Sequence, residues 1–199
     1  MVTENKTDTG RVRPDIPHLP MDTLINHIRV MCNHDAADEA WMLDWMAGML
    51  THPNVKPEQA LVVVGPQGSG KGLFAKLVER VVGPEKAVTT VNLKSRFNAE
   101  LENKILVHYT EPTRFEIGPF MSLLSDQTIS IRAKKRDSIV APSYHRVVVT
   151  SNAPVSGDDR RIRQVIHERV EDAAYYRAVA AAIDDDGAIQ ELRAYLLAR

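Results

Sequence analysis

Apolar and polar residues follow one another along this chain in runs whose periods predict helices and strands in turn. Where apolar residues recur every three or four positions, the pattern predicts amphipathic helices. Asp35 precedes the wide apolar surface from Trp41 to Leu50, so it is expected to cap a helix there. The predicted helices cover residues 21–51 in two pieces, 70–82, 115–124 and 171–199, the last broken near 184–187.

Short continuous apolar runs predict buried strands between these helices. Residues 128–140 alternate on both sides of a basic tip, which predicts a β-hairpin with Lys134, Lys135 and Arg136 at its turn. Strands alternating with helices indicate an α/β fold with a mostly parallel central sheet flanked by helices. The predicted strands cover 60–64, 87–91, 104–109, 144–150 and 164–170, and 93–101 is expected to be a short helix or turn.

Composition changes this picture in a few ways. The chain has 199 residues, of which 44% are hydrophobic and 26% charged, as in a soluble globular protein. A net charge of −1 predicts no overall attraction to nucleic acid, so DNA binding needs a local basic patch. The single Cys32, expected on a buried helix face, excludes an internal disulfide framework and a cysteine zinc site.

The domain organisation follows from the same patterns. Residues 1–20 are polar with three prolines and are expected to form a flexible arm. A helical segment over 21–55, a core over 56–170 and helices over 171–199 are expected to follow. No apolar run is long enough to cross a membrane, and the amino terminus has no apolar signal core, so a cytoplasmic protein is expected.

The run LVVVGPQGSGKGLFAK at 61–76 has the strand–loop–helix order of a phosphate-binding loop. Glycines let backbone N–H groups point at phosphate oxygens, and Lys71 is placed to reach the β- and γ-phosphates, so ATP and Mg²⁺ are the expected ligands. Gly72 stands where such loops usually carry the hydroxyl that binds Mg²⁺. The residues expected to bind the nucleotide are Gly65, Pro66, Gln67, Gly68, Ser69, Gly70, Lys71, Gly72 and Leu73.

Two polar residues follow buried strands and are expected at the same edge of the sheet. Glu111 is placed to orient or deprotonate a water molecule, directly or beside Mg²⁺, with Thr110 helping to hold the ion. Asn152 is placed to hold a water molecule near the γ-phosphate. The alternatives are a surface glutamate before Pro112 and a turn-forming asparagine.

Arg160 and Arg161 carry a further prediction. An arginine supplied by a neighbouring subunit stabilises charge on a transferred phosphoryl group, which requires an oligomer and most simply a ring. The alternative is a solvated run of charges. In a ring, Lys134, Lys135 and Arg136 would line a channel and contact the phosphates of a single strand. No aromatic residue lies at this tip in the sequence, so base stacking is not predicted there.

As a set, these segments resemble superfamily 3 helicases, and in particular the AAA+-like ATPase domain of phage and plasmid primase-helicases. The resemblance covers about residues 41–170. The matching segments are GPQGSGKG (65–72), RFN (96–98), ILVHYTEP (105–112), ISIRAKKRD (129–137), VVVTSN (147–152) and DRR (159–161).

The resemblance implies a P-loop NTPase core, a hexameric ring and an ATP-driven DNA helicase or translocase in the replication of a phage or mobile element. It maps Lys71 to the phosphate lysine, Glu111 to the acidic strand end and Asn152 to the sensor. It also maps Lys134 or Lys135 to the DNA-tracking hairpin and one of the two arginines, Arg160 or Arg161, to the trans finger.

Two further functions stay open. Thr110 stands where an aspartate usually precedes the acidic residue, which favours a nucleotide-binding assembly or regulatory module with weak hydrolysis. The other is a small-molecule kinase, but the sequence offers no recognisable lid segment for one. Related helicases carry a primase or origin-binding domain upstream, so this chain is either an excised domain or one that recruits a separate protein for those functions.

Overall fold

The structure is a computed structural model that describes residues 20–93, 95–111, 117–155 and 160–199. The arm expected over residues 1–20 therefore lies outside the described residues except for Pro20. The centre of the fold is a five-stranded sheet in the order β2-β3-β6-β1-β7, in which each neighbouring pair is parallel. The strands are β1 (Ala60–Val64), β2 (Ala87–Thr90), β3 (Leu106–Thr110), β6 (Arg146–Ser151) and β7 (Ile162–Ile166).

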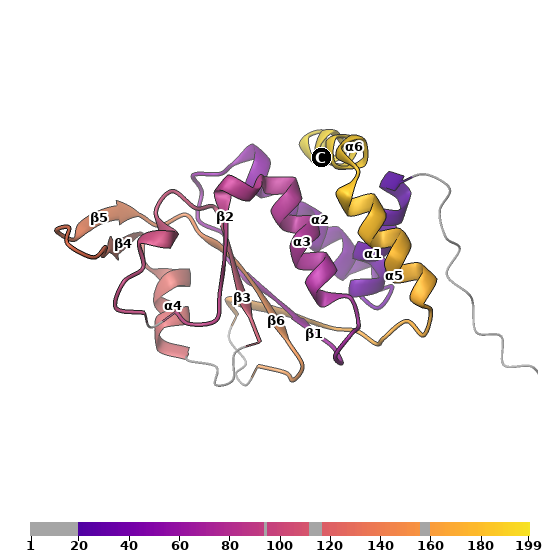
Figure 1. Ribbon diagram of the computed structural model, residues 1–199, viewed down its shortest axis with the longest axis horizontal. Helices are drawn as coiled ribbons and strands as arrows, with labels where there is room; N and C mark the ends of the chain where they lie inside the picture. The colour runs from indigo at the N-terminus through magenta and orange to yellow at the C-terminus, as the bar shows by residue number, and fades with distance from the viewer. Residues whose placement is uncertain (1–19, 94, 112–116, 156–159) are drawn as a thin grey trace, which may run out of the picture.

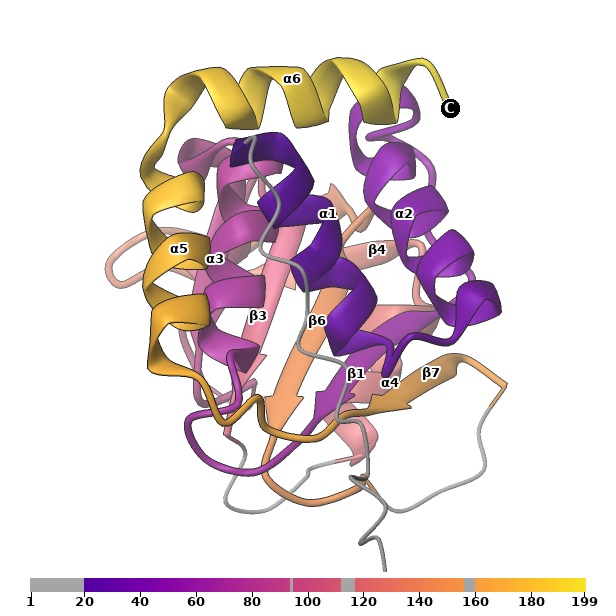
Figure 2. The ribbon, with the colours of Figure 1, turned by 90° about the vertical axis from the view of Figure 1, so that its right-hand side faces the viewer.

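The sheet is covered on both faces, as its continuous apolar strands require. In β1, alternate residues point to opposite faces, so that Leu61 and Val63 belong to one apolar cluster and Val62 and Val64 to the other. Figures 1 and 2 show most of the helices gathered against the first of these faces. They are α1 (Pro20–Met31), α2 (Ala36–Thr51), α3 (Lys71–Val82), α5 (Ala173–Asp184) and α6 (Asp186–Leu197).

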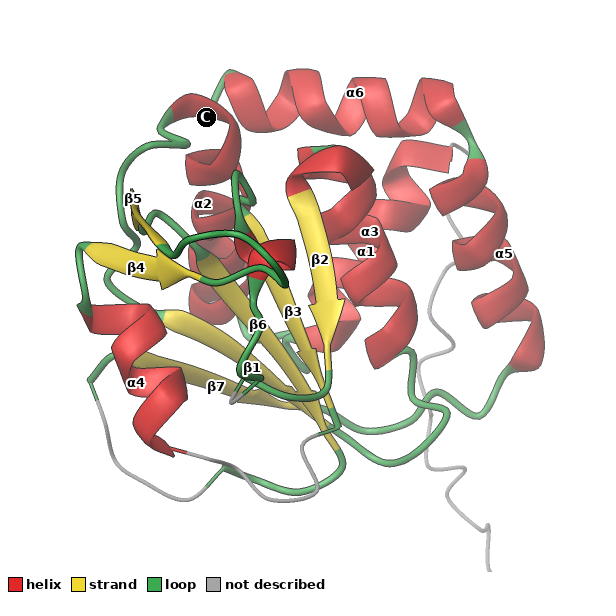
Figure 3. Ribbon diagram, turned by 60° about the vertical axis from the view of Figure 1, so that its left-hand side comes forward, coloured by secondary structure: helices red, strands yellow, loops and turns green. Residues whose placement is uncertain are grey.

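The second face is covered by α4 (Ile117–Ser125), whose Phe120 is fully buried. A separate antiparallel hairpin of β4 (Thr128–Ile131) and β5 (Ile139–Pro142) follows it. The hairpin leads into the start of β6, and Figure 3 shows it near the end of the sheet where the strands begin. The carboxyl ends of the strands are therefore at the opposite end of the sheet from the hairpin.

The expected α/β fold with a mostly parallel sheet between helices is confirmed. Asp35 caps α2 as predicted, because its carboxylate accepts hydrogen bonds from the backbone N–H groups of Ala37 and Asp38, each at 2.9 Å. The hairpin and the break between the last two helices are confirmed as well. Cys32 is 2% exposed just after α1, where burial raises the pKa of its thiol to about 12.

Several element boundaries differ from the predicted ones. Strand β3 begins at Leu106 rather than at 104, and β7 covers Ile162–Ile166 rather than 164–170. The short helix or turn expected over 93–101 is confirmed at its end, where the chain forms the 3-10 turn η2 (Ala99–Leu101); a second such turn, η1 (Pro84–Lys86), precedes β2. Pairing with neighbouring strands sets these limits, and a single sequence does not show that pairing. The division of the chain into four segments stays a prediction.

Candidate functional site

The glycine-rich loop connects the buried strand β1 to the first residue of α3. It starts beside β6, where the backbone N–H of Gly65 donates to the carbonyl of Ser151 at 3.2 Å. Gly68 and Gly70 have φ angles of 75° and 93°, in a region that side chains other than glycine rarely enter. Gly70 is the N-cap residue of α3 and offers no side chain to its first N–H groups. The loop thus presents the amino end of a helix, which attracts anions.

Close neighbours leave little room for a side chain at two of the loop glycines, and only the second of these also has a positive φ. A Cβ atom at Gly65 would lie 2.7 Å from Nε2 of His167 and 2.9 Å from Oγ of Ser69. A Cβ atom at Gly70 would lie 2.9 Å from Cε1 of His27 and 3.0 Å from Cε1 of Tyr176. The loop is therefore packed tightly against α1, α5 and the segment after β7. Gly72 differs, because a Cβ atom there would meet nothing within 4 Å.

Lys71 is held at the centre of the loop by three oxygen acceptors. Its Nζ donates to the carbonyls of Gly65 at 2.7 Å and Pro66 at 2.9 Å, and to Oδ1 of Asn152 at 2.9 Å. Burial lowers the pKa of the Lys71 ammonium, and the nearby negative charge of Glu111 partly offsets that shift. The three direct acceptors are neutral and no ion pair joins the ammonium to a carboxylate of the described residues, so a phosphate oxygen is a favourable replacement for either carbonyl.

Glu111 and Asn152, both predicted from the sequence, are brought to this edge of the sheet. Their strands end side by side, because Thr110 in β3 pairs with Thr150 in β6. Glu111 has a positive φ of 39°, and its N–H donates to the carbonyl of Thr150 at 2.9 Å. Both side chains are exposed. The carboxylate and the amide thus lie at the same edge of the sheet as Lys71, where they can contact a bound ligand or its metal ion.

The sequence analysis missed residues that follow β7. The N–H of His167 donates to the carbonyl of Val64 at 3.0 Å, which places the imidazole against the loop. Burial and the charge of Lys71 lower the pKa of His167, and its Nδ1 lies 3.0 Å from the carbonyl of Glu168. The neutral ring therefore donates from Nδ1 and accepts at Nε2, which lies 3.4 Å from Oγ of Ser69.

An arginine from the same segment lies beside the loop. A Cβ atom at Gly68 would be 3.7 Å from Nη1 of Arg169. The Arg169 side chain is half exposed, and its ion pair with Glu171 is long, at 3.9 Å. His167 and Arg169 could have been predicted from their position just after a strand. The predicted strand extended to residue 170 and therefore included both of them.

Arg160 and Arg161 are not brought to this edge. They precede β7, whose first residue Ile162 pairs with Ala60 at the start of β1. Because β1 is five residues long, this end lies roughly 13 Å from the loop. Arg161 Nη1 donates to Oγ of Ser125, and the carbonyl of Arg160 accepts a hydrogen bond from Gln59 Nε2 at 2.7 Å. These arginines therefore do not contact the loop of their own chain, and the role predicted for them stays a prediction.

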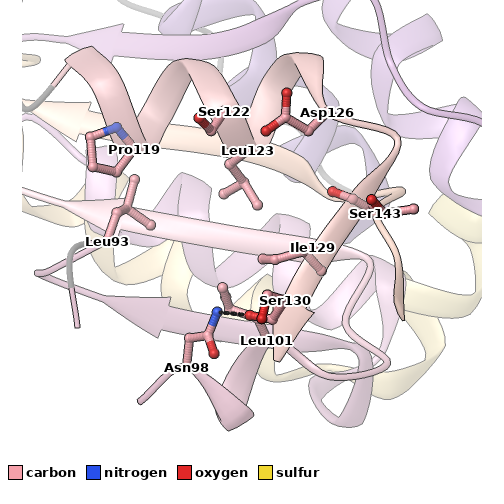
Figure 4. A pocket seen from close by; sticks show the side chains of 11 residues that line it. Leu93, Asn98, Leu101, Pro119, Ser122, Leu123, Asp126, Ile129, Ser130 and Ser143 are labelled. Atoms are coloured by element: carbon pink, nitrogen blue, oxygen red, sulfur yellow. Dashed lines mark hydrogen bonds between the residues drawn. The ribbon is translucent and has the colours of Figure 1, made fainter. Parts of the chain in front are cut away.

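A pocket of about 260 Å³ lies on the α4 side of the sheet and contains none of the predicted site residues. Figure 4 shows its lining, in which Pro119 and Asp126 come from α4 and its end, and Asn98 and Ile129 lie opposite. The catalytic and binding predictions are thus all outside this pocket.

A metal ion at this edge would need oxygen atoms from its ligand as well as from the protein. Among the described residues, no three His, Cys, Asp or Glu side chains cluster closely enough to hold a metal ion. A Mg²⁺ ion here would depend on Glu111, the hydroxyl of Thr110 and the oxygens of its ligand. None of the described helices combines the length and the apolar character needed to cross a membrane.

Comparisons with known proteins place the sequence in a different group from the one expected. Residues 63–163 match a family described as a family of unknown function (DUF5906). The DNA primase-polymerase of Nitratiruptor phage NrS-1 is 24% identical over 174 residues, which are 80% of this chain and 24% of that protein.

Solved structures give the same answer for the fold. Two apo structures of the NrS-1 C-terminal region superpose with TM-scores of 0.69 and 0.72, at 20% and 22% identity. They cover 89% and 86% of this chain, and 51% and 45% of those chains. The chain thus spans at most about half the length of these relatives.

These matches correct the sequence-based assignment. The expected membership in superfamily 3 helicases is wrong, because the central part of the chain matches DUF5906 and the curated relative is a DNA primase-polymerase. The ATP-dependent helicase or translocase function drawn from that resemblance is wrong for the same reason. The loop, strand-end and hairpin motifs on which the assignment rested are not specific to that function. Ring assembly and a separate primase or origin-binding partner stay predictions.

Proposed function

The chain belongs to the DUF5906 family, and on that premise we propose that it is a nucleotide-binding domain of a DNA primase-polymerase-like protein. In this proposal the loop from Gly65 to Gly72 binds the phosphate chain of a nucleoside triphosphate, so the core is of the P-loop type. The domain would belong to an enzyme of DNA synthesis, as the name of the phage relative suggests.

The observation that carries the proposal is the position of Lys71. Its ammonium lies at the amino end of α3, between the loop carbonyls and Asn152, and its charge has no carboxylate within ion-pairing distance among the described residues. A triphosphate brings several anionic oxygens to such a place, where a helix amino end and a lysine attract them together.

ATP and Mg²⁺ fit the donor set at this edge. Lys71 and the loop N–H groups would hold the phosphates, and Glu111 with Thr110 would hold the ion through oxygen atoms. Bound Mg²⁺ neutralises phosphate charge. Asn152 would orient the ligand through its amide, and the half-exposed guanidinium of Arg169 beside Gly68 would add a second cation.

DNA is the proposed macromolecular partner, in line with the name of the relative. The exposed hairpin tip, Lys134, Lys135 and Arg136, would contact phosphates there. Because the hairpin lies at the other end of the sheet, the nucleotide and the DNA would bind at separate places (Figure 3).

Titration calorimetry with Mg²⁺ tests the nucleotide site. ATP and dATP should bind, AMP should bind at least roughly tenfold more weakly, and Lys71→Ala should weaken ATP binding by a similar factor. Lys86→Ala is the matched control, because this exposed lysine lies just after the carboxyl end of α3, the end away from the loop. Equal ATP affinity for Lys71→Ala and the control would overturn the proposal.

A further inference from the structure

An exposed aromatic ring lies beside the basic hairpin tip, although it is far from the tip in the sequence. The side chain of Phe97 is 36% exposed. The guanidinium carbon of Arg96 lies 5.6 Å from the centre of its ring, and Nζ of Lys134 lies 5.8 Å from it. The cluster of these three side chains, called the Phe97 platform below, combines a flat apolar face with two cations.

Hydrogen bonds from Asn98 hold the platform against the hairpin. The Asn98 N–H donates to the carbonyl of Arg132 at 3.1 Å, and Oδ1 accepts from the Arg132 N–H at 2.8 Å. Nδ2 of Asn98 donates to the carbonyl of Ser130 at 3.0 Å, as Figure 4 shows. One side chain thus joins residues more than 30 positions apart and fixes the neighbouring ring.

Local bonds fix the ring further. The hydroxyl of Ser95 donates to the carbonyl of Phe97 and accepts from the Phe97 N–H at 3.3 Å. This turn holds Phe97 at the surface, where 36% of the residue stays exposed. These bonds hold the backbone before and after the ring, so Phe97 projects from a fixed segment and can contact a flat partner.

The tip adds charge and an unusual backbone conformation. Arg132, Lys135 and Arg136 are exposed, and Asp137 is the carboxylate that follows them. Lys135 has a φ of 58°, a conformation that glycine adopts without strain. Keeping a lysine there costs stability, as strained residues at binding sites commonly do. The strain is consistent with a use for the charge.

We infer that the Phe97 platform binds single-stranded nucleic acid, with one base stacked on the Phe97 ring and the flanking phosphates on Arg96, Lys134 and the tip. This inference rests on the DNA contact proposed for the hairpin and adds a base contact to it. Proteins that bind single strands combine a basic surface with aromatic rings in this way. In a duplex the faces of the bases are already stacked, so a single strand is the partner that the ring favours.

Fluorescence anisotropy with two oligonucleotides of equal length tests the inference. One is a labelled oligo-dT, and the other is its abasic counterpart, which has the same phosphates without bases. Phe97→Ala should weaken oligo-dT binding about tenfold and leave abasic binding unchanged. Phe97→Tyr, which keeps the ring, should bind both as the unchanged protein does.

The double variant Lys134→Ala, Lys135→Ala tests the phosphate binding separately. It should weaken both oligonucleotides and reduce the slope of log affinity against log salt by about 0.7 for each phosphate that the variant no longer binds. If it changes neither, the hairpin contact of the proposed function is wrong, while the Phe97→Ala result still decides the stacking. Lys86→Ala, at an exposed lysine outside both proposed sites, should bind both oligonucleotides as the unchanged protein does and is the matched control.

Three results would overturn the base contact. The first is an affinity of the Phe97→Ala variant for oligo-dT that equals that of the unchanged protein. Equal weakening of both oligonucleotides by Phe97→Ala, with a lowered thermal midpoint, would mean that the ring only supports the hairpin. Binding of a poly-glutamate peptide as tight as that of oligo-dT, and insensitive to Phe97→Ala, would mean a surface for acidic polymers in general.

Discussion

His27 and Tyr175 are 148 residues apart in the sequence, and Nδ1 of the first lies 2.8 Å from the hydroxyl of the second. The pair joins α1 to α5. A Cβ atom at Gly70 would lie only 2.9 Å from Cε1 of His27, so the pair also packs against the glycine-rich loop. Conditions that disturb His27 should therefore disturb both the fold and the loop.

The first prediction concerns acid. Burial lowers the pKa of His27 from 6.5 to about 4. Between these two pH values, His27 binds a proton in the unfolded chain but not in the folded one. The free energy of unfolding is therefore highest above pH 6.5 and falls as the pH drops toward 4. At pH 5, His27 alone should cost about 2 kcal/mol.

Urea unfolding at pH 7.5 and pH 5 measures this loss. His27→Asn keeps a hydrogen-bonding group without a titrating ring, so its stability should be lower at pH 7.5 but should fall less between the two pH values. His108, whose pKa burial also lowers to about 4, keeps part of the loss in both proteins. An identical loss in the variant would contradict this account of His27.

The second prediction compares two glycines of the loop. Gly70→Ala should reduce the free energy of unfolding by about 1–3 kcal/mol, because its φ of 93° and its close contacts both oppose a side chain. Gly72→Ala should raise it by about 0.5–1 kcal/mol, because alanine favours the helix and has open space there. Chemical denaturation of both variants checks the opposite signs.

The third prediction concerns the partner of Lys71. Asn152→Asp would place a carboxylate 2.9 Å from the ammonium, where it competes with the phosphates for the same charge. ATP affinity should fall roughly tenfold or more, by more than in Asn152→Ala. Calorimetry on the two variants measures the difference, and equal affinities would show that Asn152 does not tune the charge of Lys71.

The fourth prediction concerns the missing hydroxyl. Because nothing lies within 4 Å of a Cβ atom at Gly72, a serine fits there and can offer its hydroxyl to Mg²⁺. Gly72→Ser should tighten ATP binding roughly threefold to tenfold with Mg²⁺ and leave it unchanged with EDTA. Gly72→Ala controls for helix stability, and a serine variant that behaves like it would mean that no ion binds at this position.

Local patterns predicted much of this fold. The apolar run at 60–64 and the glycines after it identified β1 and the loop, because each signal lies within one short segment. Glu111 and Asn152 were predicted at the loop because parallel strands end at one edge. These inferences needed no knowledge of distant contacts.

The missed features depend on distant contacts instead. Base stacking at the hairpin was not predicted, because Phe97 and Lys134 meet only after Asn98 pairs with Arg132 and Ser130. His167 and Arg169 reach the loop only through the pairing of β7 with β1. The helicase family was assigned from short motifs, which a P-loop core can share with proteins of other activities.

The position of β1 in the sheet has a consequence for how the protein is made. Its two neighbours, β6 and β7, are synthesised more than 80 residues after it. On the ribosome, this apolar strand must therefore wait without these partners while more than 80 further residues are made, open to wrong pairing and to chaperones. The glycine-rich loop after β1 can take its final shape only when β6 and β7 have joined the sheet.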